Sequence, residues 1–300
     1  MARDNYQLIT DHITAALEEL AAGTRTIAPW QRPWNASAAA AHNGHTGHVY
    51  RGINLLLIWC SGYADPRWYT FKQVSDNYGA SHVRKGEKGT TVTFFQVVSV
   101  KDDDETTDGK RARRRPLLRT YTVFNHAQIE WEAGREPAAP ELKALDPAAA
   151  HAEAMAALVA TGASVEHGGE RACYSPSLDA IRMPPVGAFR DEAAYISTRA
   201  HETVHWTGHT TRCARDLSGR FGSESYAAEE LVAEIGAAFF CADFGLPSQL
   251  DENHLPYLAS WIKVLRGDKF AIFTAARLAR EAVGYIRGER AAADDVADVA

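Results

Sequence analysis

The sequence predicts an α+β fold in two domains, the first built from helices and strands and the second mainly from helices. Segments with helical periodicity and segments with strand periodicity both occur, and the longest strand-like runs lie in the first half. The chain has 300 residues, more than one compact core usually takes. An Ala- and Pro-rich segment, 133–149, lies where the local charge balance changes sign, which favours a domain boundary there.

The first half combines helices with a strand pair. Apolar residues recur at helical spacing from Leu8 to Leu20, and Gly23 ends the pattern. Residues 28–49, rich in Pro, Gly and Asn, predict a long loop. Two runs rich in β-branched and aromatic residues predict an antiparallel hairpin whose connection, 101–116, is a charged loop. The predicted elements are helices at 4–22, 54–60 and 70–78 and strands at 89–100 and 117–124.

The second half has longer helical stripes and little strand pattern. Its predicted elements are helices at 148–161, 191–208, 225–244 and 255–287 and a pair of short strands around 172–174 and 180–183. The predicted organisation is a first domain at 1–135, a linker at 136–149, a second domain at 150–290 and a disordered tail at 291–300.

The composition, 46% hydrophobic and 23% charged, is that of a globular protein and excludes fibrous and wholly disordered classes. No run of eighteen uncharged apolar residues occurs, and the first twenty residues carry acids where a signal peptide would need a basic start. The four cysteines form no C-x-x-C pair, as expected for reduced thiols. We therefore expect a cytoplasmic protein without a membrane partner.

A metal-binding pattern, His201-Glu202-Thr-Val-His205, lies in a segment that favours a helix. Spacing of i, i+4 places both imidazoles on one helix face, where one metal ion can bridge them. Glu202 is expected to face the open coordination position, where its carboxylate can take a proton from water and return it to a leaving group. The pattern predicts a metal-dependent hydrolase with Glu202 as catalytic residue.

Zinc in hydrolases usually has three protein ligands, and the predicted helix at 225–244 carries three glutamates. Glu230 and Glu234 are one turn apart, so one can bind the metal while the other accepts the outer N–H of a histidine. Glu229 points about 100° away from Glu230 around the helix, so its loss is expected to cost far less metal affinity than the loss of Glu230, with Glu234 intermediate. The alternative is that all three glutamates lie on a solvated face.

A third histidine is the other common way to complete such a site. In that pattern, H-E-x-x-H-x-x-G-x-x-H, the last histidine follows the glycine by three residues. Gly208 is present, but the required position is Thr211, and His209 is two residues away from it. A glutamate ligand is therefore preferred to His209.

Aromatic and basic residues alternate in the first half, where residues 25–101 carry nine Lys and Arg against three Asp and Glu. Rings can stack on bases while Arg and Lys follow the phosphate backbone, which is typical of sequence-tolerant binding to single strands. The alternative is that about half of these rings are core. The candidate DNA-binding residues are Trp30, Trp34, Tyr50, Arg51, Trp68, Lys72, Arg84, Lys85 and Lys88.

Segments 201–208 (HETVHWTG) and 228–239 (AEELVAEIGAAF) resemble the metallopeptidase domain of ArdC-type antirestriction proteins from conjugative plasmids. Segments 174–184 and 257–268 are similar to other parts of that domain. The resemblance implies a zincin-like fold in which Glu230 is the third ligand and Glu234 the acid behind a ligand histidine.

Segments 50–55, 68–73, 83–89 and 123–128 resemble the N-terminal domain of the same family, which is known for single-stranded DNA binding and also occurs at the front of some plasmid primases. The resemblance covers nearly the whole chain. It leaves the charged loop 101–116 without an assigned role.

These observations lead to one expectation about function. We expect an antirestriction protein of a mobile element that binds single-stranded DNA and carries one divalent metal ion, zinc or alternatively manganese, in a peptidase domain of the HExxH-plus-Glu type that acts on a protein substrate. Two alternatives remain open. One is a dedicated zinc metallopeptidase without DNA binding, and the other is a DNA-binding protein whose metal is purely structural.

Overall fold

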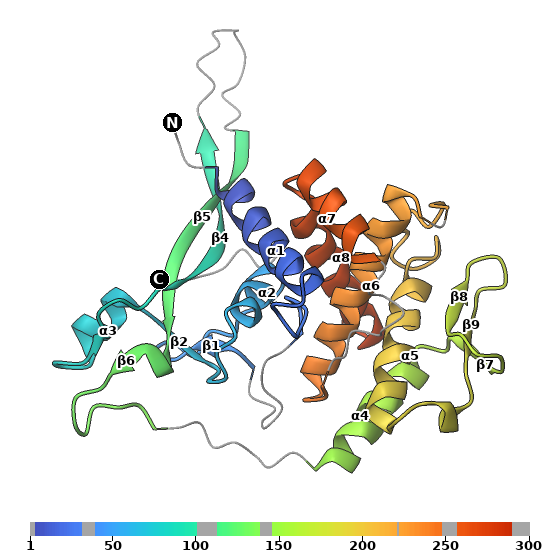
Figure 1. Cartoon of the computed structure of the whole chain (residues 1–300), viewed down its shortest axis with the longest axis horizontal. Coiled ribbons are helices and arrows are strands. Elements are labelled where there is room, and N and C mark those ends of the chain that lie inside the picture. Colours follow the sequence, from blue (N-terminus) through green and yellow to red (C-terminus); the bar gives the residue numbers. More distant parts are fainter. Residues whose placement is uncertain are drawn as a thin grey trace, which may run out of the picture.

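The computed structural model describes residues 4–31, 40–100, 113–138, 146–220, 222–247 and 257–289. For residues 95–100 and 113–117 it describes the backbone alone. Trp34, most of the predicted charged loop and the predicted tail lie outside these residues. Figure 1 shows an N-terminal half of helices around a sheet and a C-terminal half in which helices dominate. The predicted α+β class with two domains is confirmed.

The N-terminal half is built around a four-stranded sheet of order β1-β2-β5-β4. Asp4 caps the first helix by accepting from the backbone N–H groups of Tyr6 and Gln7, and Thr70 and Gln73 form a capping box that starts the third. A two-stranded pair, β3 and β6, completes this half. The elements are α1 (Asn5–Ala21), β1 (His42–Asn43), α2 (Ile53–Cys60), β2 (Arg67–Thr70), α3 (Phe71–Asn77), β3 (His82–Val83), β4 (Thr90–Val100), β5 (Arg113–Asn125), η1 (His126–Gln128) and β6 (Ile129–Glu130).

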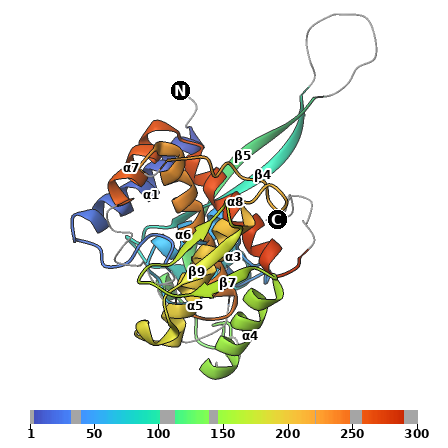
Figure 2. The same ribbon diagram turned by 90° about the vertical axis from the view of Figure 1, so that its right-hand side faces the viewer.

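The predicted hairpin is confirmed and is longer than predicted. β4 and β5 pair in antiparallel register from Thr90↔Val123 to Val100↔Arg113, so β5 begins four residues before the predicted start at 117. The sequence did not indicate this start, because a run of charged residues favours a loop. Figure 2 shows the far end of the hairpin standing clear of the helices.

The C-terminal half packs helices α4 to α8 with a small sheet of order β7-β9-β8. β7 was not predicted, because its residues are mostly exposed and show no apolar alternation. The elements are α4 (Pro147–Ala160), β7 (Ser164–His167), β8 (Cys173–Ser175), β9 (Ala180–Met183), η2 (Val186–Ala188), α5 (Glu192–Thr207), α6 (Glu224–Asp243), α7 (Leu258–Gly267) and α8 (Ala271–Ile286).

The predicted single helix at 255–287 is wrong, since two helices, α7 and α8, occupy this segment. α7 ends at Gly267, and Asp268 is extended, with φ −141° and ψ 111°. The Asp268 side chain accepts from the backbone N–H of Phe270 at 2.8 Å. This side-chain bond competes with the helical one and turns the chain into α8.

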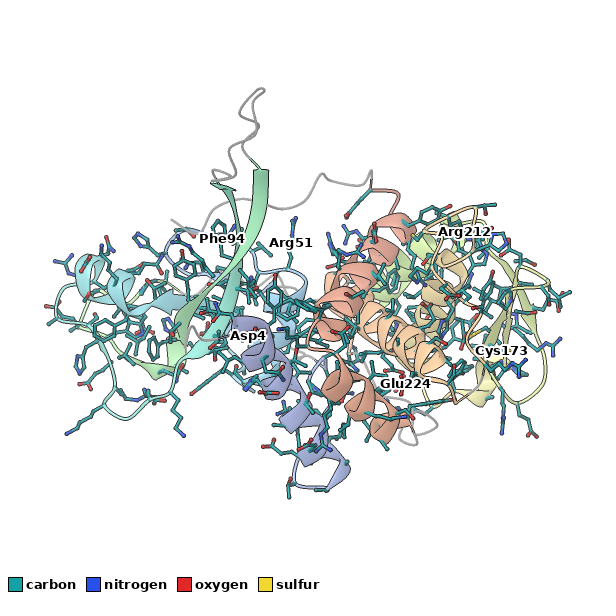
Figure 3. The ribbon with its side chains drawn as sticks, turned by 90° about the horizontal axis from the view of Figure 1, so that it is seen from above. Asp4, Arg51, Phe94, Cys173, Arg212 and Glu224 are labelled. Atoms are coloured by element: carbon teal, nitrogen blue, oxygen red, sulfur yellow. The ribbon has the colours of Figure 1, made fainter. Side chains whose placement is uncertain are left out.

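The two halves share one continuous hydrophobic core. Trp30 packs edge-to-face on Trp261 of α7 with ring centroids 5.3 Å apart, and Trp59 of α2 packs on Phe239 of α6 at 5.8 Å. The Thr10 hydroxyl of α1 donates to the Lys269 carbonyl at 2.7 Å. Figures 1 and 3 show α1 lying along α7. Each half therefore covers apolar surface of the other. Within the described residues, no helix has the length and apolar character that a membrane span needs.

Candidate metal centre

Helices α5 and α6 approach each other closely enough for their polar side chains to meet in a buried space. Asp191 caps α5 by accepting from the N–H of Ala194, and Ser223 caps α6. Gly236 of α6 lies against Val204 of α5, where an added Cβ would come within 2.8 Å of a Val204 methyl. The absence of a side chain at Gly236 thus permits the close approach, and it brings the α5 histidines to the α6 glutamates.

Three ligand atoms from these helices converge. The Nε2 atoms of His201 and His205 are 3.2 Å apart, and Glu230 oxygens lie 3.6 Å from His201 Nε2 and 3.5 Å from His205 Nε2. Tetrahedral zinc with bonds of 2.0–2.1 Å has ligand atoms about 3.3–3.4 Å from one another. Among the described residues these three form the one group of this kind, so the donor set fits a small divalent cation.

The outer nitrogens of both histidines face carboxylates. His201 Nδ1 lies 3.4 Å from a Glu234 oxygen, and His205 Nδ1 lies 3.1 Å from Glu229 Oε1. A carboxylate at Nδ1 keeps a proton there and leaves the Nε2 lone pair to point inward. Two inward lone pairs and the Glu230 carboxylate repel one another unless a metal ion or a proton lies between them. This is the arrangement that sequence reasoning expected of Glu234.

Glu229 contacts a ligand histidine, which the small role expected for it did not anticipate. Its 100° rotation from Glu230 does not take it away from the metal ligands, because His205 lies a full turn beyond His201 on α5 and turns its outer nitrogen toward that side of α6. Arg215, which sequence reasoning did not single out, donates to both Glu229 oxygens at 2.8 and 3.0 Å. The first contact depends on the relative rotation of the two helices and the second on the course of the segment between them, and no local sequence pattern indicates either.

The carboxylates control the charge of the site. Burial opposes a charge on His205, but Glu229 and Glu230 outweigh burial and raise its pKa to about 9. Burial would raise the pKa of Glu230, but the hydrogen bond from His201 and the charge of His205 lower it to about 2. Without a metal ion, His205 is therefore a charged imidazolium at neutral pH, with a proton on each ring nitrogen.

Glu202 differs from the glutamates of α6. It is buried beside His201, yet its carboxylate makes no hydrogen bond or ion pair with another described residue. Glu229, Glu230 and Glu234 are all held by histidine contacts. A buried carboxylate that is not held by the protein is available to a reacting group, as the proposed role of general base requires.

Tyr226 is a further residue of the site that sequence reasoning missed. Its hydroxyl interacts with Glu230, one turn further along α6, and lies 3.5 Å from the hydroxyl of Tyr257. Burial and these neighbours raise the pKa of Tyr226, so its phenol stays protonated and acts as a donor. The i, i+4 spacing from Glu230 was the available signal. His209, by contrast, bonds to Thr211 and does not join the donor group.

The predicted DNA-binding residues separate into two sets. Trp30, Tyr50 and Trp68 are 1%, 2% and 0% exposed, so the prediction that their rings stack on bases is wrong. They fill the core, which is the alternative that composition had left open. Trp34 lies outside the described residues. The charged candidates are all exposed, namely Arg51, Lys72, Arg84, Lys85 and Lys88.

Two family models match most of the chain. Residues 3–124 match the N-terminal domain of anti-restriction factor ArdC, and residues 150–278 match a zincin-like metallopeptidase. An uncharacterized protein, y4eC of Sinorhizobium fredii, is 36% identical over 295 residues, which cover 96% of this chain and 92% of that protein. A DNA primase TraC of Escherichia coli is 37% identical over 90% of this chain but only 26% of its own length.

Solved structures extend the likeness to the whole fold. The metal-free crystal structure of the antirestriction protein ArdC from plasmid R388 is 35% identical, has a TM-score of 0.73 and covers 96% of this chain and all of its own. The Mn(II)-bound structure of the same protein has a TM-score of 0.71 at 36% identity and covers 95% of this chain and 98% of its own. The chain therefore belongs to the ArdC family of antirestriction proteins, with an ArdC N-terminal domain followed by a zincin-like domain.

Proposed function

We propose that this chain binds one divalent metal ion through His201, His205 and Glu230 and uses the site for hydrolysis of a peptide bond. The converging donor triangle is the observation that carries this proposal. Two imidazoles and one carboxylate at tetrahedral spacing favour zinc, although a carboxylate ligand also suits manganese, the ion bound in a crystal structure of the R388 protein. Elemental analysis of the chain as purified, and after reloading with each ion, tests the stoichiometry and the preference.

The residues of the site have distinct parts in such a reaction. When bound, the ion would supply a Lewis acid beside the peptide carbonyl. Glu202 accepts the proton of the attacking water and passes it to the leaving amine. Tyr226 stays protonated and holds Glu230, while Glu229 and Glu234 fix the orientation of His205 and His201.

Metal affinity is expected to rise with pH. Since the pKa of His205 is about 9 without a metal ion, the ion must displace that proton at pH 7. The affinity should increase about tenfold per unit between pH 7 and 9 and then level off, because above the pKa no proton remains to be displaced. Chelator competition measured from pH 6.5 to 9.5 checks this slope, and a flat profile would show that His205 is already neutral.

We further propose that the N-terminal half binds single-stranded DNA. A turn between β3 and β4 presents exposed cations outward and is fixed from behind, because the Arg84 N–H donates to the Gln128 carbonyl and the Gln128 side chain donates to the Lys88 carbonyl. Gly86, with φ +90°, forms the tight part of this turn. Lys72, Lys85 and Lys88 make no ion pair with another described residue, so their charges are available to phosphates.

Lys85→Ala is expected to weaken single-strand binding several-fold and to reduce the slope of log affinity against log salt by about 0.7, the loss of one phosphate contact. The control is Lys263→Ala, an exposed lysine on α7 that pairs with Glu224. The full chain is required, since a fragment of residues 1–135 would uncover the apolar surfaces that α1 and α2 bury against α6 and α7. Fluorescence titration with single- and double-stranded oligonucleotides at two salt concentrations measures both quantities. Equal losses in both variants would remove Lys85 from the interface.

The two proposed activities fit an antirestriction role for a mobile element, in line with the plasmid origin of the R388 relative. Incoming single strands would be bound by one half, and a protein substrate would be cleaved by the other. Two rivals have clear discriminators. A dedicated peptidase would show no affinity for DNA, whereas a DNA-binding protein with a structural metal would retain every activity when Glu202 is replaced.

A further inference from the structure

We propose that Arg215 is a positioning residue of the metal centre, which holds Glu229 against His205 so that His205 presents its inner nitrogen to the ion. This inference rests on the metal site proposed above. It assigns a role to a residue that lies ten positions beyond His205 and outside the H-E-x-x-H pattern and its glutamate.

Arg215 is one of the most firmly held side chains near the site, with 3% of the side chain exposed. Nε donates to Glu229 Oε2 at 3.0 Å and Nη2 to Glu229 Oε1 at 2.8 Å, which is a bidentate pair. Nη1 donates to the Thr207 hydroxyl at 2.9 Å, and Nη2 also donates to the Val204 carbonyl at 2.6 Å. Such a fork fixes both the position and the plane of the carboxylate it binds.

The fixed carboxylate acts on a metal ligand. Glu229 Oε1 accepts from Arg215 and also lies 3.1 Å from His205 Nδ1, so one oxygen joins the guanidinium to the imidazole. An imidazole whose outer N–H has a fixed acceptor cannot rotate its ring freely. The inner nitrogen, 3.2 Å from its His201 counterpart, is thereby kept in the donor triangle.

The segment after α5 is shaped to return Arg215 to this place. The Cys213 N–H donates to the Thr207 carbonyl at 2.8 Å, and the Arg215 N–H donates to the Gly208 carbonyl at 2.9 Å, which folds the chain back over the end of α5. An added Cβ on Gly208 would lie 3.0 Å from Arg215 Nη2 and 2.9 Å from a Leu217 methyl. The glycine after the second histidine is therefore explained by the room that the guanidinium needs.

Arg212 provides a matched control. It lies in the same returning segment, is equally buried with 6% of its side chain exposed, and donates to a carbonyl of α5, that of Trp206, at 2.6 Å. Its guanidinium pairs with Asp179 and covers the Trp206 ring at 3.8 Å, without a contact to the metal-site histidines or glutamates. Any general effect of losing a buried arginine from this segment should appear in both variants.

The test is chelator competition with Zn²⁺ on the full chain, combined with the visible absorption of the Co²⁺-loaded protein. Arg215→Ala should weaken metal binding about 10–100-fold, as loss of a ligand's supporting partner usually does, and should change the Co²⁺ spectrum. Arg212→Ala should leave both within about twofold of wild type. Arg215→Lys, which keeps the charge but not the fork, should recover part of the affinity and keeps the test open if the alanine variant does not fold.

A double-mutant cycle decides whether Arg215 acts through Glu229. Arg215→Ala should add less than about twofold in a Glu229→Ala background, because the intermediary is already gone. Full additivity, equal losses in the Arg212 and Arg215 variants, or wild-type affinity in Arg215→Ala would each overturn the inference. A wild-type chain that binds no Zn²⁺ would instead refute the proposed metal site, and the inference with it.

Discussion

Replacing Glu202 with glutamine is expected to lower peptide hydrolysis by about 100- to 10,000-fold, the usual range for loss of a general base, while the bound metal ion stays in place. The amide has nearly the same size as the carboxylate but cannot accept the proton of water. Glu202 is not a member of the donor triangle and makes no hydrogen bond with another described residue, so its replacement should disturb neither the metal ligands nor the fold.

Two measurements check this prediction. Hydrolysis of casein by the Zn²⁺- and Mn²⁺-loaded chain reports the chemistry, and plasmid transfer into a restricting recipient reports the proposed antirestriction role. Glu224→Gln is the matched control, since this glutamate also lies on the metal-site helices but is exposed and pairs with Lys263. Affinity for single-stranded DNA should be unchanged in both variants. If Glu202→Gln cleaved casein at the wild-type rate, the assigned mechanism would be wrong.

The helix that carries the H-E-x-x-H pattern was predictable because residues close together in the sequence determine it. Spacing alone places His201 and His205 on one face, and the capping residue Asp191 directly precedes the helix. The approximate position of α6 followed from its apolar stripe in the same way. The contact between the two helices depends on Gly236 and Val204, which no sequence pattern links. Glu229 reaches His205 only through this contact, and Arg215 reaches Glu229 because the segment after α5 folds back over the end of that helix.

For the aromatic residues the prediction from sequence was wrong, because it placed core rings on the surface. Trp30 and Trp68 lie in a segment rich in cations, which suggested an exposed surface that stacks on bases. Trp30 instead packs on Trp261, more than 200 residues further along the chain, and Trp68 packs beside Tyr63. Composition cannot distinguish an exposed ring from a core ring, because both need an apolar face. The prediction for the lysines is more secure. An unpaired lysine keeps its charge in water because burial would be costly, and a phosphate can reach it there.

Replacing a residue of the donor triangle is expected to have the largest effect on metal binding. Glu230→Ala or His205→Ala removes one of three protein ligands, so the affinity for Zn²⁺ should fall well beyond the about 10–100-fold that supporting residues contribute. Glu229→Ala and Glu234→Ala should fall within that smaller range and should resemble each other, since each carboxylate faces the outer nitrogen of one histidine. The earlier expectation of a small effect for Glu229 is thus replaced.

Thermal unfolding gives a second measure of the same ranking of variants. An ion present at about 100 times its dissociation constant stabilises the folded state by about 2.7 kcal/mol. In a chain somewhat smaller than this one, each kcal/mol of added stability raises the melting temperature by about 2–4 °C. Zn²⁺ should therefore raise the wild-type melting temperature by about 5–10 °C. The Glu230→Ala and His205→Ala variants should show almost no rise at the same concentration. A variant of His209, whose side chain hydrogen-bonds to Thr211 and not to the donor triangle, serves as the control.

The ranking of the three glutamates decides which acid completes the centre. The two Glu230 oxygens lie 3.6 and 3.5 Å from the Nε2 atoms of His201 and His205, whereas Arg215 holds Glu229 at the outer nitrogen of His205. If Glu229→Ala cost the most affinity, the rotation of α6 would differ from the one described. A dominant loss in the His209 variant would restore the three-histidine pattern. Equal, small losses in all three glutamate variants would mean that the ion is held by the two histidines alone, and a centre of that kind would be too weak to contribute the expected rise in melting temperature.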